Sequence, residues 1–166
     1  MHVPETAAME LHDVNLILTV SILSAWQNIY FARKVSMIRN KHNIRHGSTT
    51  GHTEFETVYY ANQNLQQYYS TFLVLLWGAG LFTSQVWAAA IGLLYLFARQ
   101  RYVKGYLGPA TCRPTGFFFA KRTMMTLSGL VAIGLLNHCL KRFLGVEFDD
   151  YVANIAQAAP AVLLFV

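Results

Sequence analysis

The sequence contains 166 residues, of which 54% are hydrophobic and 13% are charged, and its formal net charge is +5 at pH 7. Soluble domains carry about 25% charged residues, so this composition argues against a water-soluble protein and indicates that lipid surrounds much of the chain. The cations flank apolar segments and form no separate basic domain, which argues against nucleic acid as a partner. We therefore expect a single integral membrane domain over residues 1–166, with membrane lipid around it.

Four apolar segments, each close to the roughly 20 residues that cross a bilayer, follow one another along the chain. They predict an all-α membrane protein built as a four-transmembrane-helix bundle, with helices at approximately 13–35, 54–82, 86–107 and 116–141. The first segment is too long, and its start too acidic, for a cleavable signal peptide. Thr83-Ser84-Gln85 is a very short turn, so the helices on either side of it should run antiparallel. Residues 146–166 are predicted to form an amphipathic C-terminal tail.

The distribution of lysine and arginine predicts how these helices cross the membrane, because cytoplasmic loops retain an excess of cations. Five cations follow the first helix, and six surround the connection between the third and the fourth. The N-terminus is acidic, and the turn between the second and third helices carries no charge. We expect a multi-pass protein whose basic loops are cytoplasmic and whose two termini are lumenal.

One stripe of polar residues lies on the second predicted helix. Its members recur at helical spacing and therefore share one face: Tyr60, Asn64, Gln67 and Thr71. Hydrogen bonds between helices in a membrane explain such a stripe, and for the stripe alone we prefer that interpretation.

A second polar group lies at the end of the third predicted helix and just beyond it, and it consists of Arg99, Tyr102, Tyr106 and Arg113. Aromatic and cationic residues collect at membrane interfaces as anchors, which explains this group without any ligand. Both groups are nevertheless predicted on the same side of the membrane, together with Gln27 and Asn28 of the first helix. A site between helices for an amphiphile or an anion is therefore a second hypothesis.

Patterns that hold metals or nucleotide cofactors are absent from the sequence. The six histidines are scattered, mainly over the N-terminus and the first loop, and none forms an HExxH or comparable pattern. No GxGxxG, Walker or GxSxG sequence occurs. We expect neither a metal site nor a cofactor.

Three stretches resemble one family of membrane proteins, that of eicosanoid and glutathione metabolism. They are FETVYYANQN at 55–64, TFLVLLWGAGL at 71–81 and YLFARQRYVKGY at 95–106. The first two resemble the family pattern FERVY-x-A-x-x-N followed by LW-x-AG, and the likeness covers nearly the whole chain. It implies a homotrimer of four-helix protomers in the nuclear envelope and endoplasmic reticulum.

Within that family, further stretches resemble the members that activate 5-lipoxygenase, among them Ser84-Gln85-Val86, Gly105-Tyr106-Leu107-Gly108 and the segment 145–151. This likeness implies a scaffold without catalytic residues that binds arachidonic acid and presents it to 5-lipoxygenase for leukotriene biosynthesis. Lys121 would pair with the fatty-acid carboxylate at the membrane boundary. The implied lipid site lies between neighbouring protomers and comprises Ile29, Tyr30, Ala32, Asn64, Gln67, Tyr68, Thr71, Phe117, Phe118 and Lys121.

The alternative within the same family is an enzyme, a glutathione transferase or leukotriene-C synthase that uses glutathione as co-substrate. Its implied glutathione site comprises Asn64, Tyr68, Arg99, Tyr102, Tyr106 and Arg113, with Arg113 stabilising the thiolate. Two departures argue against it, because Tyr60 and Gln67 stand where the enzymes have an arginine and a glutamate. Each charged hydrogen bond lost would cost about 1.5–3 kcal/mol, so we prefer the scaffold.

Overall fold

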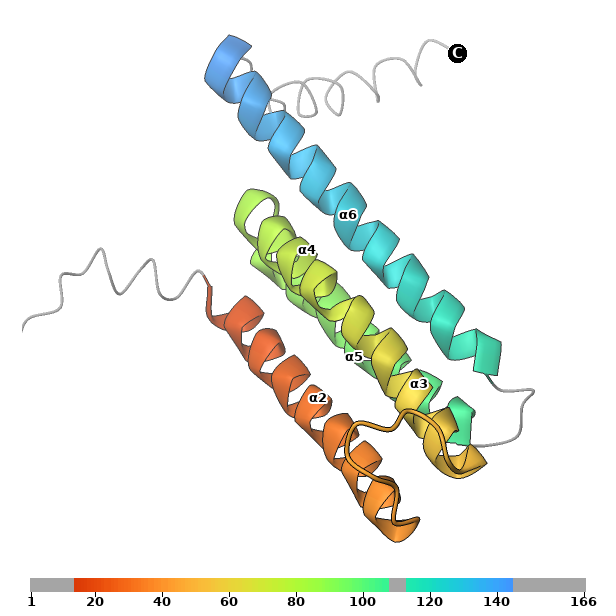
Figure 1. The fold of residues 1–166 in the computed structure, drawn as a ribbon. Helices are drawn as coiled ribbons and strands as arrows, with labels where there is room; N and C mark the ends of the chain where they lie inside the picture. The colour runs from red at the N-terminus through yellow and green to blue at the C-terminus, as the bar shows by residue number, and fades with distance from the viewer. Residues whose placement is uncertain (1–13, 108–112, 145–166) are drawn as a thin grey trace, which may run out of the picture.

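The computed structural model describes residues 14–107 and 113–144, and it places helices along almost all of them (Figure 1). These are α2 (Asn15–Lys41), α3 (Thr53–Gln67), α4 (Tyr69–Phe82), α5 (Gln85–Leu107) and α6 (Arg113–Leu144). Only Tyr68 separates α3 from α4, so the described chain forms four helical rods. The predicted all-α fold is confirmed, and the homotrimer stays a prediction.

The rods pack side by side with α5 at the centre. α5 contacts α2, α3, α4 and α6, while α2 and α6 flank the bundle on opposite sides (Figure 1). The innermost contacts are made by Phe72 and Leu76 of α4 and by Tyr95 of α5, all of which are buried. The rings of Phe72 and Tyr95 stack with their centroids 4.1 Å apart. These contacts hold α4 and α5 together, and the other helices pack against this pair.

Large apolar side chains cover the outside of the bundle. Trp26, Val74, Trp87 and Met125 are each at least 65% exposed in the single chain. Soluble proteins rarely expose apolar surface on this scale, so lipid or other protein must cover it. Within α6, the segment Gly116–Phe143 has by itself the length and apolarity needed to cross a membrane, and it is the one described segment that does.

The end of α2 differs from the predicted end of the first helix. α2 continues beyond the predicted end at residue 35 to Lys41, because Phe31, Val35 and Ile38 recur on one buried face. Val35 and Ile38 pack on Phe55 and Val58 of α3. Arg33 and Lys41 are exposed on the other side of α2, so these cations do not end the helix. The predicted tail 146–166 lies outside the described residues.

The single helix predicted over 54–82 is interrupted at Tyr68. The interruption is mild, because Tyr68 keeps a right-handed backbone conformation (φ −97°, ψ −3°) and its carbonyl accepts a hydrogen bond from the Phe72 N–H at 2.9 Å. Neither proline nor glycine marks the position. The sequence therefore offers no signal for the break.

The loop from α2 to α3 is tied to both helices by charged side chains. Arg39 donates hydrogen bonds from one guanidinium nitrogen to the carbonyls of Arg45 and Ser48, at 2.9 and 3.0 Å, and its Cζ lies 4.7 Å from the centre of the Phe55 ring. At the start of α3, hydrogen bonds from Lys41 and then from His42 lower the pKa of Glu54 from 4.5 to about 2. Glu54 is therefore a carboxylate at physiological pH.

Candidate functional site

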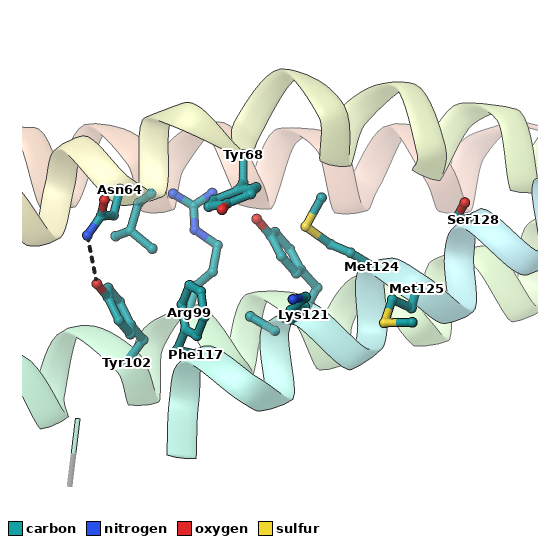
Figure 2. A pocket seen from close by; sticks show the side chains of 12 residues that line it. Asn64, Tyr68, Arg99, Tyr102, Phe117, Lys121, Met124, Met125 and Ser128 are labelled. Carbon is teal, nitrogen blue, oxygen red and sulfur yellow. Dashed lines mark hydrogen bonds between the residues drawn. The ribbon is translucent and has the colours of Figure 1, made fainter. Parts of the chain in front are cut away.

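A cavity of about 240 Å³ lies between the end of α3, α5 and α6 (Figure 2). Several of its lining residues are exposed in the single chain, so the cavity opens at the surface of the bundle. Its lining combines a few polar groups with a larger apolar wall, the usual make-up of a small-molecule site. It consists of Asn64, Leu65, Tyr68, Tyr95, Arg99, Tyr102, Phe117, Ala120, Lys121, Met124, Met125 and Ser128.

Helical spacing explains why these residues meet. On α5, Tyr95, Arg99 and Tyr102 follow one another at intervals of four and three, which places them on one face. On α6, Phe117, Lys121, Met124 and Ser128 do the same and form the opposite wall.

Gly116 lets the start of α6 approach α5 closely. A Cβ atom at Gly116 would lie 2.6 Å from both the backbone nitrogen and the Cα of Tyr102, which is closer than real Cβ contacts allow. The approach brings the rings of Phe117 and Tyr102 to a centroid distance of 6.3 Å. The glycine thus fixes the width of one end of the cavity.

Arg99 is the strongest electrostatic feature of the cavity. It is only 1% exposed, and one terminal nitrogen donates a hydrogen bond to Asn28 Oδ1 at 2.9 Å. Its Cζ lies 5.7 Å from the ring centres of Tyr69 and of Tyr95, so the charge rests against aromatic faces.

The other donors of Arg99 are poorly satisfied in the described part of the chain, where the Tyr95 side chain favours the guanidinium charge. Among the described residues its Nε and other terminal nitrogen have no hydrogen-bond partner, and no carboxylate pairs with it. An unpaired buried charge is costly, and polar residues at membrane depth usually mark a ligand or ion site. The arrangement is therefore suited to an anionic or strongly hydrogen-bonding group of a ligand in the cavity.

The second polar contact of the cavity joins α3 to α5. Asn64 Nδ2 donates a hydrogen bond to the Tyr102 hydroxyl at 3.3 Å (Figure 2). The amide oxygen of Asn64 and the hydroxyl hydrogen of Tyr102 can then serve a ligand. Tyr106, whose ring lies 5.0 Å from that of Tyr102, lines a neighbouring smaller pocket with Lys34 and Asn62.

The far part of the cavity is apolar apart from Ser128. Lys121 stands between the polar end and the two methionines, Met124 and Met125, on the wall formed by α6 (Figure 2). Flexible methionine side chains adapt to apolar ligands of different shape. The cavity as a whole suits a molecule with an anionic part and an apolar part.

Of the residues predicted for a lipid site, Asn64, Tyr68, Phe117 and Lys121 line the cavity. The others lie elsewhere on the surface of the single chain. Phe118 is 60% exposed on α6, and the remaining five are exposed on α2 or near the α3–α4 junction: Ile29, Tyr30, Ala32, Gln67 and Thr71. A lipid site between protomers stays a prediction.

Of the residues predicted for a glutathione site, Asn64, Tyr68, Arg99 and Tyr102 line the cavity. Tyr106 lies beside them in the neighbouring pocket. Arg113 is the first residue of α6, and its side chain lies outside the described part of the structure.

Gln27 and Asn28, which were predicted on the same side of the membrane, support the cavity from behind and do not line it. Gln27 Nε2 donates a hydrogen bond to the Leu96 carbonyl at 2.9 Å, and Asn28 accepts the one from Arg99. Both tie α2 to α5 behind the cavity, and neither lines it.

Sequence reasoning missed six lining residues: Leu65, Tyr95, Ala120, Met124, Met125 and Ser128. All but Leu65 could have been found by extending the faces of Arg99 and Lys121 along their helices at intervals of three and four.

Comparison with known proteins extends over nearly all of the described chain. The sequence model of the MAPEG family matches residues 17–133, a range that contains every residue lining the cavity. The chain is 41% identical over 142 residues to microsomal glutathione S-transferase 2 of Mus musculus, which covers 86% of this chain and 94% of that protein. It is 36% identical over 132 residues to microsomal glutathione S-transferase 2 of Bos taurus, with 80% and 90% covered.

Proposed function

This chain belongs to the MAPEG family, and on that premise we propose that it is a glutathione-dependent transferase of the membrane. The observation that carries the proposal is Arg99, a buried cation with unused donors beside a cavity. Glutathione supplies two carboxylates and two amide carbonyls, which such donors recognise. The names of the relatives in Mus musculus and Bos taurus support the same substrate.

The cavity residues divide between the two parts of the reaction. Arg99 binds a carboxylate of glutathione through charge-assisted hydrogen bonds, and Asn64 and Tyr102 hold its amide backbone. Met124 and Met125 receive the apolar electrophile. The division follows the position of the residues, since the polar ones lie on α3 and α5 and the two methionines lie on α6.

The chemical step is attack by the glutathione thiolate. The thiol gives its proton to solvent, and the sulfur then forms a bond to an electrophilic carbon of the second substrate while that carbon loses its bond to a leaving group or an epoxide oxygen. A nearby cation lowers the pKa of the thiol. Arg113 has this part in the family resemblance, and within the described cavity Lys121 is a second cation beside Arg99.

This proposal reverses our preference from the sequence, which was for a scaffold without enzymatic activity. The relatives do not support the absence of activity, since both are named as transferases. The two residues that argued against an enzyme, Tyr60 and Gln67, are exposed and do not line the cavity. Their lack of charge therefore leaves the described cavity unchanged.

A scaffold that presents arachidonic acid to 5-lipoxygenase is the second candidate. Lys121 next to Met124 and Met125 supports it, because an ammonium beside an apolar wall suits a fatty acid. Either function fits the nuclear envelope and the endoplasmic reticulum membrane, and a homotrimer, as the family resemblance implies.

Glutathione conjugation by the purified protein tests the first candidate. We expect turnover of a generic electrophile, and of leukotriene A if the chain is a leukotriene-C synthase. Arg99→Gln should abolish it, while Arg101→Gln, an exposed cation two positions along α5, should not. Arg113→Ala tests the thiolate role separately.

Absence of turnover in folded protein would reject the enzyme. Arachidonate binding then tests the scaffold, with Lys121→Gln compared with Arg122→Gln, which changes an exposed neighbour that does not line the cavity. Equal arachidonate affinity in the two variants would reject the head-group role of Lys121.

A further inference from the structure

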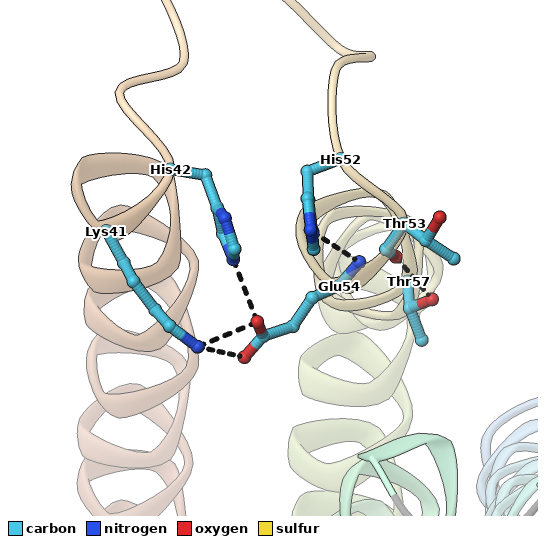
Figure 3. Close-up of polar contacts among 6 residues, drawn as sticks. All are labelled: Lys41, His42, His52, Thr53, Glu54 and Thr57. Carbon is cyan, nitrogen blue, oxygen red and sulfur yellow. Dashed lines mark hydrogen bonds and ion pairs between the residues drawn. The ribbon is translucent and has the colours of Figure 1, made fainter.

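The loop between α2 and α3 brings together three side chains that are known as metal ligands: His42, His52 and Glu54 (Figure 3). Their ligand atoms all lie within 4.8 Å of one another. His42 follows the last residue of α2, His52 is the N-cap of α3, and Glu54 lies in the first turn of α3. The cluster is remote from the cavity and independent of the function proposed above.

Within the cluster, His42 already faces the carboxylate of Glu54, and the His52 ring lies nearly parallel to the His42 ring. His42 Nε2 lies 2.8 Å from a carboxylate oxygen of Glu54, and the rings of His42 and His52 stack with centroids 3.7 Å apart. The Nδ1 atom of His52 accepts a hydrogen bond from the Glu54 backbone N–H at 3.2 Å. That bond caps α3 and makes the neutral ring the Nε2–H tautomer, so a nitrogen of His52 can bind a metal ion only after the cap bond is broken.

We propose that His42, His52 and Glu54 form a binding site for a divalent transition-metal ion, with Zn²⁺ as the ion that best fits the donors. Two imidazoles and one carboxylate are an established ligand set for Zn²⁺, with water in the fourth position. Donors of one tetrahedral Zn²⁺ lie about 3.4 Å apart, given bonds of about 2.0–2.2 Å. His42 Nε2 and its carboxylate oxygen of Glu54, now 2.8 Å apart, must therefore separate slightly, and the more distant donors, at most 4.8 Å apart, must approach by at most about 1.4 Å. Rotation of the partly exposed side chains supplies both movements.

Lys41 competes with the metal for the same carboxylate. Its Nζ lies 2.8 and 3.1 Å from the two oxygens of Glu54 (Figure 3). Lys41 is mostly exposed, so its side chain can swing into water when a cation takes its place. Zn²⁺ and the Lys41 ammonium are alternative partners of the Glu54 carboxylate. If the cluster were only an ion pair, removing Lys41 would not strengthen the binding of a metal ion.

A bound ion would join the end of α2 to the start of α3. Directly beneath the cluster, Val35 and Ile38 of α2 pack on Phe55 and Val58 of α3. The metal would close the end of this contact, and α3 carries Asn64 to the cavity. The site thus stabilises the helix pair that holds one wall of the cavity.

Zinc titration of the full chain, purified without a polyhistidine tag, tests the proposal by competition with a chromophoric chelator. We expect one tight Zn²⁺ per chain. Loss of a residue that only supports a ligand already costs about 10- to 100-fold in affinity, so His42→Gln and His52→Gln should each weaken binding at least tenfold. Lys41→Gln should strengthen it. His46→Gln is the matched control, since His46 is exposed in the same loop and outside the cluster.

The proposal is overturned if the double variant His42→Gln/His52→Gln binds Zn²⁺ as tightly as the unsubstituted protein, or if His46→Gln weakens binding equally. Circular dichroism establishes that each variant is folded. Should a variant fail to fold, Co²⁺ in the unsubstituted protein decides the question. Visible bands of four-coordinate Co²⁺ that Zn²⁺ removes would support the site, and their absence would overturn it.

Discussion

Two charged clusters of this chain are built in opposite ways. At the start of α3, Glu54 is shared by Lys41 and His42 in contact with water. At the cavity, Arg99 is buried, is held by a single described hydrogen bond to Asn28, and has no carboxylate partner among the described residues. The Glu54 carboxylate at the loop has two side-chain partners, whereas the Arg99 guanidinium at the cavity has donors left without one among the described residues.

The difference separates two uses of charge. Exposed ion pairs form and break at little cost because water replaces either partner. A buried guanidinium has no such substitute, so its unused donors favour any ligand that can satisfy them. Glu54 at the loop can exchange one partner for another, whereas the unused donors of Arg99 are satisfied only when a ligand binds.

The largest effect is expected for Arg99→Lys. Lysine keeps the charge but lacks the planar fork that can hold Asn28 and a ligand together. Loss of one charge-assisted hydrogen bond costs about 1.5–3 kcal/mol, so glutathione affinity should fall at least tenfold. Calorimetric titration with glutathione measures this, and an unchanged affinity would remove Arg99 from the binding site.

A large loss of stability is expected for Gly116→Ala. The new Cβ would meet the backbone of Tyr102, which cannot move away as a side chain can. Overpacking of this kind costs about 1–3 kcal/mol. The thermal unfolding midpoint should fall, whereas Gly129→Ala on the same helix has no atom within 4 Å of its Cβ and should leave it unchanged or raise it. Equal midpoints for the two variants would contradict the close approach of α5 and α6.

A smaller effect is expected for Tyr102→Phe. It removes the hydroxyl that accepts the hydrogen bond from Asn64, a contact worth about 1 kcal/mol. Loss of the hydrogen bond that we assign to the Tyr102 hydroxyl and glutathione should raise the KM about fivefold, and loss of the bond from Asn64 should lower thermal stability slightly. A KM that stays the same would place glutathione away from Tyr102.

The smallest effect is expected for Lys41→Arg. Both side chains reach the exposed carboxylate of Glu54, so thermal stability and transferase activity should stay within experimental error. Lys41→Arg is the mirror image of Arg99→Lys. If the two exchanges had equal consequences, the contrast between the clusters would be wrong.

The sequence predicted the helices better than their details. Apolar segments of spanning length correctly predicted four helical rods. The predicted end of α2 was too early, because Lys34 and Arg39 occur among its buried residues and cations usually end a spanning segment. The break at Tyr68 was missed because no residue type announces it. Packing on α3 accounts for the extension of α2, and nothing in the structure explains the break at Tyr68.

Some residues of the candidate site could also be predicted from the sequence. Asn64, Arg99 and Tyr102 were predicted to be polar residues on one side of the membrane, and they meet at the cavity. The burial of Arg99 was not foreseen, because the same residue type at a membrane interface is ordinarily an exposed anchor. The cluster of His42, His52 and Glu54 was missed because the fold of the loop, and no short spacing, brings its members together.

The apolar end of the cavity has a practical consequence for every assay of this protein. Met124 and Met125 lie on a wall that opens at the surface, where a hydrocarbon tail from any surfactant meets them. In micelles the surfactant is present in large excess over the second substrate and competes for the same wall. Saturation curves for the electrophilic substrate should therefore shift with tail length and surfactant concentration, while those for glutathione, which we propose binds the polar end, should not.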